Sequence, residues 1–409
     1  MRIFNFNFGI NKHIHERRCI ICISSPQNDM TKGTLMEQTA RKTILLIGAT
    51  LAISAPISSY AAVLDDMGEA NGICAKIELP CIATGNFAVV NPLAGDEALL
   101  DFIPQSQKRF TSHFTIEEIP SIVWRMTGER DASLDATKQN AEFEKVVILP
   151  WLSEAQKSAL IRSQVEEQVR AQMAGQPEVV IQSILQQAYA QLPEGPDQDT
   201  PLTELEIGAI QHEFGHFWFI YKYEGALHAK EGKTIVQYGG AAPDWLDEVV
   251  AIMMENDTLE KGRLRYFAEK GKESLVPLER YFSMQHPLIE AVQEKLGAAA
   301  AATPENGQTS SVIIMGDNEL PGTDGVDPAL AFYTQGKLFS DFMIEKTGDK
   351  RVFEVISDEI YFTGDMAKWL KTQNTYSNLP RDLTALQLAW DAWASKQLAA
   401  AVSDQNKVL

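Results

Sequence analysis

Two histidines and a glutamate, His212, Glu213 and His216, form the pattern H-E-x-x-H. Residues four apart lie on the same face of a helix, so both imidazoles can reach one metal ion. Neutral imidazole is a good zinc ligand, and Glu213 would lie beside a metal-activated water as a general base. The pattern therefore predicts a catalytic zinc centre. The alternative is an amphipathic helix that carries two histidines without binding a metal.

The surrounding sequence favours a helix at this position. Thr200 and Pro201 are suited to the N-cap and the first helical residue, and Gly225 to the end of the helix. Apolar residues recur between them at helical spacing: Leu205, Ala209, Ile210, Phe214, Phe217, Trp218 and Tyr221. A helix that is apolar on most sides is expected in a core, where histidine and glutamate are costly unless they are paired or bound to metal.

A catalytic zinc ion needs a third protein ligand and an open fourth position. The best candidate is Glu248, because Pro243 is suited to the first turn of a second helix that would place Glu248 among apolar residues facing the core. The alternative role for Glu248 is a solvated carboxylate near the helix N-terminus. His228 and Glu224 are rival third ligands, since both lie closer to the histidine pair in the sequence.

Around these residues the sequence resembles the gluzincin metallopeptidases, especially their aminopeptidase-N-like branch. In that branch the third zinc ligand is the glutamate of a W-L-x-E-G-F-A segment. Trp245-Leu246-Asp247-Glu248 and Ala251 match this segment, whereas Val249 and Val250 replace its Gly-Phe pair. The resemblance implies that Glu248 binds zinc.

A second matching segment is Tyr333-Thr334-Gln335-Gly336, which is similar to the Y-x-x-G segment of the same branch. There the tyrosine hydroxyl donates a hydrogen bond to the oxyanion that forms during hydrolysis. The resemblance, which covers about residues 205–345, therefore implies this role for Tyr333. The alternative is a tyrosine of the core or of an interface.

Three departures limit what the resemblance implies. The interval between His216 and Glu248, residues 217–247, is longer than in the aminopeptidase-N-like branch, and no G-A-M-E-N segment precedes His212. Ile252 stands where the thermolysin-like branch has an aspartate that supports a histidine ligand. The expectation is therefore a zinc site and peptide-bond hydrolysis, without aminopeptidase specificity.

Residues 36–61 predict a signal peptide. Arg41-Lys42 supply the positive start, 43–54 form a short apolar run, and Ser59-Tyr60-Ala61 is an A-x-A-like cleavage site. Because the run is too short for a transmembrane helix, we expect an exported protein, periplasmic or secreted, with no stable membrane span after cleavage. An uncleaved anchor is the alternative. Residues 1–35 are expected to be an over-extended or removed N-terminus.

Composition narrows the compartment and the partners. Cys74 and Cys81, seven residues apart in an exported chain, suggest one small disulfide loop, with two free thiols as the alternative. Residues 1–61 carry a net charge of +4, so the other residues carry −23 of the total of −19. This acidity argues against nucleic acid and anionic membrane surfaces as partners. The expected partner is a peptide or protein substrate.

The order of strand and helix patterns predicts an α+β, gluzincin-like, two-lobed catalytic unit with a small sheet. Residues 62–240 are expected to form an upstream α/β lobe with the H-E-x-x-H helix, and residues 241–409 a mainly helical lobe with Glu248 and Tyr333. The strand-like runs are 87–90, 110–116, 121–126 and 145–149; the helical patterns are 153–192, 257–274, 276–296, 327–347, 350–361 and 381–402. The polar, glycine-rich segment 298–325 is either a mobile loop that covers substrate or a solvated linker.

Together these patterns predict an exported zinc metallopeptidase, a hydrolase with one Zn²⁺ held by His212, His216 and Glu248. Glu213 is the expected general base, and Tyr333 the expected oxyanion donor. Three alternatives stay open: a catalytically degenerate zinc-site protein that binds a peptide or an envelope partner, a zinc amidase acting on cell-wall peptide, and a structural export factor whose histidines are core residues. The presence of Glu213 disfavours the first, because a pure binder needs no general base.

Overall fold

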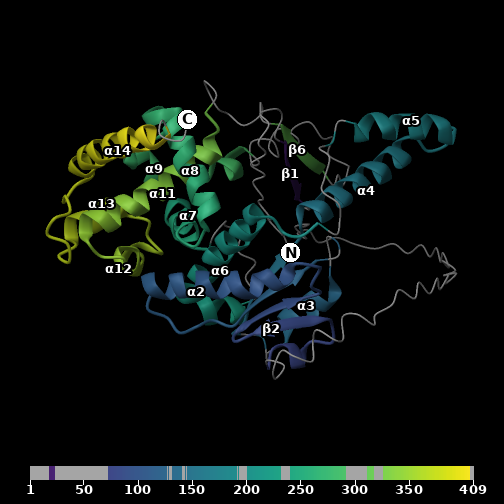
Figure 1. Ribbon diagram of the computed structural model, residues 1–409, viewed down its shortest axis with the longest axis horizontal. Helices are drawn as coiled ribbons and strands as arrows, with labels where there is room; N and C mark the ends of the chain where they lie inside the picture. The colour runs from purple at the N-terminus through teal and green to yellow at the C-terminus, as the bar shows by residue number, and fades with distance from the viewer. Residues whose placement is uncertain are drawn as a thin grey trace, which may run out of the picture.

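The computed structural model of this protein describes residues 18–23, 72–126, 128, 131–140, 143, 145–190, 192, 200–231, 240–291, 311–316 and 326–405. The fold is mixed α+β and mostly helical, with a small sheet, as the sequence predicts (Figure 1). The predicted signal peptide at 36–61 lies outside the described residues, as does most of 298–325.

The principal sheet has four strands in the order β2-β3-β4-β5. Their bounds are β2 (Cys81–Thr84), β3 (Phe87–Val90), β4 (Ser121–Arg125) and β5 (Val147–Trp151). β2 and β3 are antiparallel, whereas β3, β4 and β5 run parallel to one another. The strand-like runs at 87–90, 121–126 and 145–149 are confirmed within a few residues, whereas β2 is an additional strand.

Both faces of this sheet are buried, because alternate residues of a strand point to opposite sides. On β4, Val123 packs into the main core, while Ile122 and Trp124 pack into a smaller cluster on the other face. Leu149 and Ile148 of β5 divide in the same way. Trp218 donates from Nε1 to Ser121 Oγ at 2.9 Å, which ties the H-E-x-x-H helix to the sheet.

Helices α2 (Leu99–His113) and α3 (Ala132–Gln139) connect these strands, whereas α4 (Glu154–Gln172) and α5 (Glu178–Tyr189) follow β5 and pack against each other. The helical pattern at 153–192 is confirmed, but the strand expected at 110–116 is wrong, because Phe110 lies in α2. Leu99, Ile103 and Phe110 are buried at helical spacing, and this longer periodicity outweighs the strand-forming residues near Phe110.

The H-E-x-x-H pattern lies on α6 (Glu204–Glu231). This helix begins with a capping box at Thr203, three residues after the expected N-cap: Thr203 Oγ1 accepts from the Glu206 N–H, and Glu206 Oε2 accepts from the Thr203 N–H. The helix also continues through Gly225, where an end was expected. A glycine costs an interior helical position only about 1 kcal/mol, which neighbouring turns can offset.

The later part of the chain is helical. Its elements are α7 (Asp244–Ile252), α8 (Asp257–Lys270), η5 (Gly271–Ser274), α9 (Leu278–Ser283), α11 (Pro328–Thr347), α12 (Val352–Ile360), α13 (Met366–Thr372) and α14 (Leu383–Gln405). In Figure 1, α6 lies between the sheet and these helices. One cluster of buried apolar side chains extends from Val123 of the sheet to Trp390 of α14, so it crosses the boundary expected at residue 240. The two-lobed organisation stays a prediction.

A second, two-stranded sheet and one disulfide complete the described part of the fold. β1 (Arg18–Ile23) and β6 (Ser311–Gly316) form a separate antiparallel pair, so part of the segment 298–325 is a strand. Cys74 and Cys81 form a disulfide, which confirms the expected pairing. Among the described residues, no helix is both long enough and apolar enough to cross a membrane.

Helices α6 and α7 approach each other closely at Gly215. A Cβ atom at Gly215 would lie 2.6 Å from the Cα atom of Ala251, which is closer than two such atoms can approach. The side chain of residue 215 therefore has to be a hydrogen atom for the two helices to pack at this distance.

Gly215→Ala should lower the free energy of unfolding by about 1–3 kcal/mol, because the added methyl group meets backbone that cannot move aside cheaply. Gly225→Ala is the matched control: it lies on the same helix with no atom within 4 Å of the new Cβ, and should raise stability by about 1 kcal/mol. Urea unfolding measures both. Equal stability of the two variants would contradict the close packing.

Candidate metal centre

Helix α6 presents His212, Glu213 and His216 in a nearly buried position, with exposed fractions of 7%, 8% and 5%. Glu248 comes from α7 and is fully buried. The ligand atoms of His212, His216 and Glu248 all lie within 4.8 Å of one another, and the three residues could together hold a metal ion. The structure thus brings together the three residues that the sequence assigns to the metal.

The donor atoms lie at separations close to those around a small metal ion. The two Nε2 atoms of His212 and His216 lie 3.1 Å apart, Glu248 Oε2 lies 3.4 Å from His212 Nε2, and Glu248 Oε1 lies 3.7 Å from His216 Nε2. A four-coordinate zinc ion with bonds of about 2.0–2.2 Å separates its ligand atoms by about 3.3–3.6 Å. Neither oxygen of Glu248 has a hydrogen-bond partner among the described residues, which is costly for a buried carboxylate without a bound cation.

Two carboxylates orient the histidine rings. His212 Nδ1 lies 2.8 Å from Glu255 Oε1, and His216 Nδ1 lies 2.7 Å from Asp247 Oδ2. A carboxylate beside Nδ1 favours the proton on that nitrogen and directs the Nε2 lone pair to the metal. Both Nε2 atoms are therefore available as ligands.

These supporting residues were not predicted from the sequence. Asp247 is the variable residue of the W-L-x-E segment, and Glu255 follows the end of α7. Both are almost completely buried, with exposed fractions of 0% and 1%. Their position beside apolar runs of the sequence is a signal that could have identified them, because a buried carboxylate is costly without a partner.

Glu255 is itself anchored by arginines. Arg263 of α8 donates from Nε to Glu255 Oε2 at 2.7 Å and from Nη2 to Oε1, and Arg109 of α2 donates to the Glu255 carbonyl oxygen. This fork holds the Glu255 carboxylate against His212, so α2, α6 and α8 together fix one metal ligand.

Charge is unevenly distributed in this cluster. Glu213, Asp247, Glu248 and Glu255 are buried acidic groups, whereas Arg263 supplies the nearby permanent positive charge. Burial would lower the pKa of His212, but the carboxylates of Glu248 and Glu255 beside its ring raise that pKa to about 10. In the metal-free protein His212 is therefore protonated at neutral pH, and its positive charge partly balances the surrounding carboxylates.

Glu213 is a buried carboxyl group beside the two histidines. Burial raises the pKa of its carboxyl group above the ordinary value, while His216 and His212 act in the opposite direction. A carboxylate whose pKa is raised towards neutrality can both accept and return a proton.

Tyr333 lies beside the ligands, on α11. Its ring meets the His212 ring edge-on, with the two centroids 5.7 Å apart. The guanidinium carbon of Arg263 lies 4.7 Å from the centroid of the Tyr333 ring. Burial and the charge of Glu248 raise the pKa of Tyr333 well above its ordinary value. Its hydroxyl therefore stays protonated at neutral pH and is able to donate a hydrogen bond.

Glu224, one of the two rival third ligands, is engaged away from the centre. Glu224 accepts hydrogen bonds from the Ala241 N–H at 2.7 Å and from the Tyr361 hydroxyl at 2.6 Å, so it serves to close the chain after α6. The side chain of His228 lies outside the described part of the structure.

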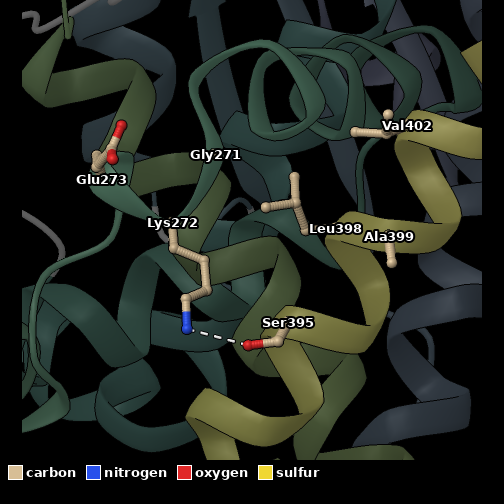
Figure 2. Close-up of a pocket in the computed structure, with 7 residues that line it drawn as sticks. All are labelled: Gly271, Lys272, Glu273, Ser395, Leu398, Ala399 and Val402. Carbon is tan, nitrogen blue, oxygen red and sulfur yellow. Dashed lines mark hydrogen bonds between the residues drawn. The ribbon is translucent and has the colours of Figure 1, made fainter.

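A shallow hollow elsewhere on the surface lies between η5 and α14 (Figure 2). Lys272 Nζ donates to Ser395 Oγ across it at 3.0 Å, and Leu398 and Val402 supply apolar lining. It contains none of the residues assigned to the metal or to catalysis.

Comparison with known proteins gives no match: no family model, curated protein or solved structure matches this chain.

Glu248→Gln should lose bound zinc on dialysis, because the amide keeps the shape of the side chain but removes its charge. His228→Ala should retain zinc, since the ion is assigned to His212, His216 and Glu248. Metal analysis by mass spectrometry measures both variants. Zinc retained by Glu248→Gln and lost by His228→Ala would reverse the assignment.

Zinc affinity should rise with pH between about pH 6 and 9, by about tenfold per unit for each proton displaced. The reason is that the pKa of His212 is raised to about 10 in the metal-free protein, so zinc must expel its proton. The same raised pKa stabilises the metal-free fold. This contribution to the free energy of unfolding is complete at pH values below 6.5, the pKa of histidine in the unfolded chain, and it is lost as the pH rises through 10.

Calorimetry in buffers with different ionisation enthalpies counts the protons released on zinc binding. Binding that releases no protons and does not depend on pH would show that His212 is already neutral in the metal-free protein.

Proposed function

We propose that this protein is an exported zinc metallopeptidase of the gluzincin type, which hydrolyses peptide bonds. The observation that carries the proposal is the convergence of the ligand atoms of His212, His216 and Glu248 within 4.8 Å of one another, with Glu213 beside the histidines on α6. A metal site with a glutamate beside it has the parts needed for hydrolysis, whereas a purely structural site does not need that glutamate.

The donor set supports zinc as the bound ion. Two neutral imidazoles and one carboxylate make the three-ligand set of catalytic zinc sites, and a fourth position stays open for water or substrate. When bound, zinc supplies Lewis-acid chemistry, which acidifies water and polarises the scissile carbonyl group. Asp247 and Glu255 would hold the two imidazoles in the orientation that this chemistry requires.

Glu213 would move the proton. Its carboxylate takes a proton from the attacking water and then gives that proton to the nitrogen of the leaving amine. The raised pKa of Glu213 supports this double role, because the group must be a base in the first step and an acid in the second.

Tyr333 would stabilise the charge that develops on the carbonyl oxygen. Its protonated hydroxyl can donate a hydrogen bond to the oxyanion, and its ring contacts both His212 and the Arg263 guanidinium. A fixed donor of this kind needs no rearrangement during the reaction.

The disulfide supports export as part of the proposal. Disulfides such as Cys74–Cys81 persist in oxidising compartments and are rare in the cytosol. A periplasmic or secreted location therefore agrees with the signal peptide expected at 36–61, and the substrate would be an extracytoplasmic peptide or protein.

Glu213→Gln should retain zinc but lower kcat/KM by about 10²–10⁴-fold, because the amide cannot accept the proton. Glu204→Gln, at the exposed start of the same helix, should leave turnover unchanged. Cleavage of a mixed peptide library, followed by mass spectrometry with and without chelator, measures the activity. Full activity of zinc-loaded Glu213→Gln would disprove the role of Glu213, and zinc-loaded protein without any cleavage would favour a binding function.

A further inference from the structure

A third buried histidine, His286, lies beside the metal centre and is not part of the H-E-x-x-H pattern. It follows α9, and its exposed fraction is 0%. Its ring packs against Phe332 and Tyr333, with centroid distances of 5.2 Å in both cases. Its backbone N–H donates to Asp244 Oδ2, on the first residue of α7, at 2.7 Å. These contacts hold the imidazole in a fixed place relative to α7 and therefore to Glu248.

The hydrogen bonds of His286 determine which ring nitrogen carries its proton. The Leu288 N–H donates to His286 Nδ1 at 3.2 Å, so Nδ1 acts as an acceptor and carries no proton. The proton of the imidazole is then on Nε2. This arrangement is opposite to that of His212 and His216, whose Nδ1 atoms face carboxylates.

The Nε2 atom of His286 faces the third metal ligand. It lies 3.6 Å from Glu248 Oε1, and both residues are fully buried. This separation is longer than a hydrogen bond, but a shift of a few tenths of an ångström would make one. In a buried site the N–H dipole attracts the carboxylate oxygen more strongly than it would in water.

We infer that His286 is a positioning residue that sets how Glu248 binds the metal. Its Nε2–H holds Oε1 of Glu248 and leaves Oε2, 3.4 Å from His212 Nε2, as the oxygen that binds the ion. Glu248 then binds through one oxygen, and the coordination position that a second oxygen would occupy stays available for water or substrate. The inference rests on the metal-binding part of the proposed function and not on peptidase activity.

His286 is not itself a fourth ligand. The group of residues whose ligand atoms lie within 4.8 Å of one another, as far as the structure describes the chain, contains only His212, His216 and Glu248. In addition, the Nε2 atom that faces the centre carries a proton and so has no lone pair to donate to a metal.

Two amide substitutions separate the positioning role from simple packing. In His286→Gln, the amide nitrogen can reach the place of Nε2 and donate to Glu248. In His286→Asn, the amide oxygen can still accept from the Leu288 N–H, but nothing reaches Glu248. Both variants lose the ring that packs against Phe332 and Tyr333, so both should lose similar stability in chelator.

The readouts are zinc affinity, from competition with a chromophoric chelator, and the visible spectrum of the Co²⁺-substituted protein. His286→Asn should bind zinc about 10–100-fold more weakly than His286→Gln. At other metal sites, the loss of a group that orients a ligand lowers metal affinity by about this factor. The Co²⁺ absorption of His286→Asn should also be weaker, because a second bound oxygen of Glu248 raises the coordination number. His286→Gln should keep the wild-type spectrum.

Equal zinc affinity and equal Co²⁺ spectra in the two variants would overturn the inference and leave His286 with a packing role only. Failure of the wild-type protein to bind zinc or Co²⁺ would instead overturn the proposed function, on which the inference rests. The two failures are therefore distinguishable in one set of measurements.

Discussion

The close approach of α6 and α7 is the constraint on which the metal centre depends. Two of the three candidate ligands lie on α6 and the third on α7, so the distance between the helix axes sets the distances between their donor atoms. Gly215 permits this approach because a side chain there would overlap the backbone of Ala251. The glycine lies inside the H-E-x-x-H pattern, at a position where ligand chemistry alone would accept any residue. Packing and metal binding thus share the same helical turn.

Burial then makes each charge in the centre depend on the others. Glu248 is fully buried beside two histidines, and those histidines are oriented by Asp247 and Glu255. A buried carboxylate without a partner would cost several kcal/mol, so removal of one member destabilises the rest. This mutual dependence explains why an extended network, reaching as far as Arg263, surrounds only three metal ligands.

Sequence patterns predicted those residues of the site that a local motif within a single helix identifies. The histidine pair follows from helical spacing, and Glu248 from the W-L-x-E segment, and the structure brings these residues together. The orienting carboxylates Asp247 and Glu255 could not be assigned, because the ring that each one meets depends on how α6 packs against α7 and on the turn before α8. The strand expected at 110–116 failed for a related reason: aromatic residues suit strands locally, but burial along all of α2 favours a helix. Zinc, peptide hydrolysis and export stay predictions.

The contacts between the candidate ligands and the carboxylates that orient them are short in sequence, whereas those that attach these helices to the rest of the fold are long. His212 and Glu255 are 43 residues apart, but the bond from Trp218 to Ser121 spans 97 residues and that from Ser106 to the Met254 carbonyl spans 148. Short loops close faster than long ones, so the ligands of α6 and α7 can meet before the sheet docks. We therefore expect the ion to bind a partly folded chain, and the rate of refolding to depend on zinc concentration.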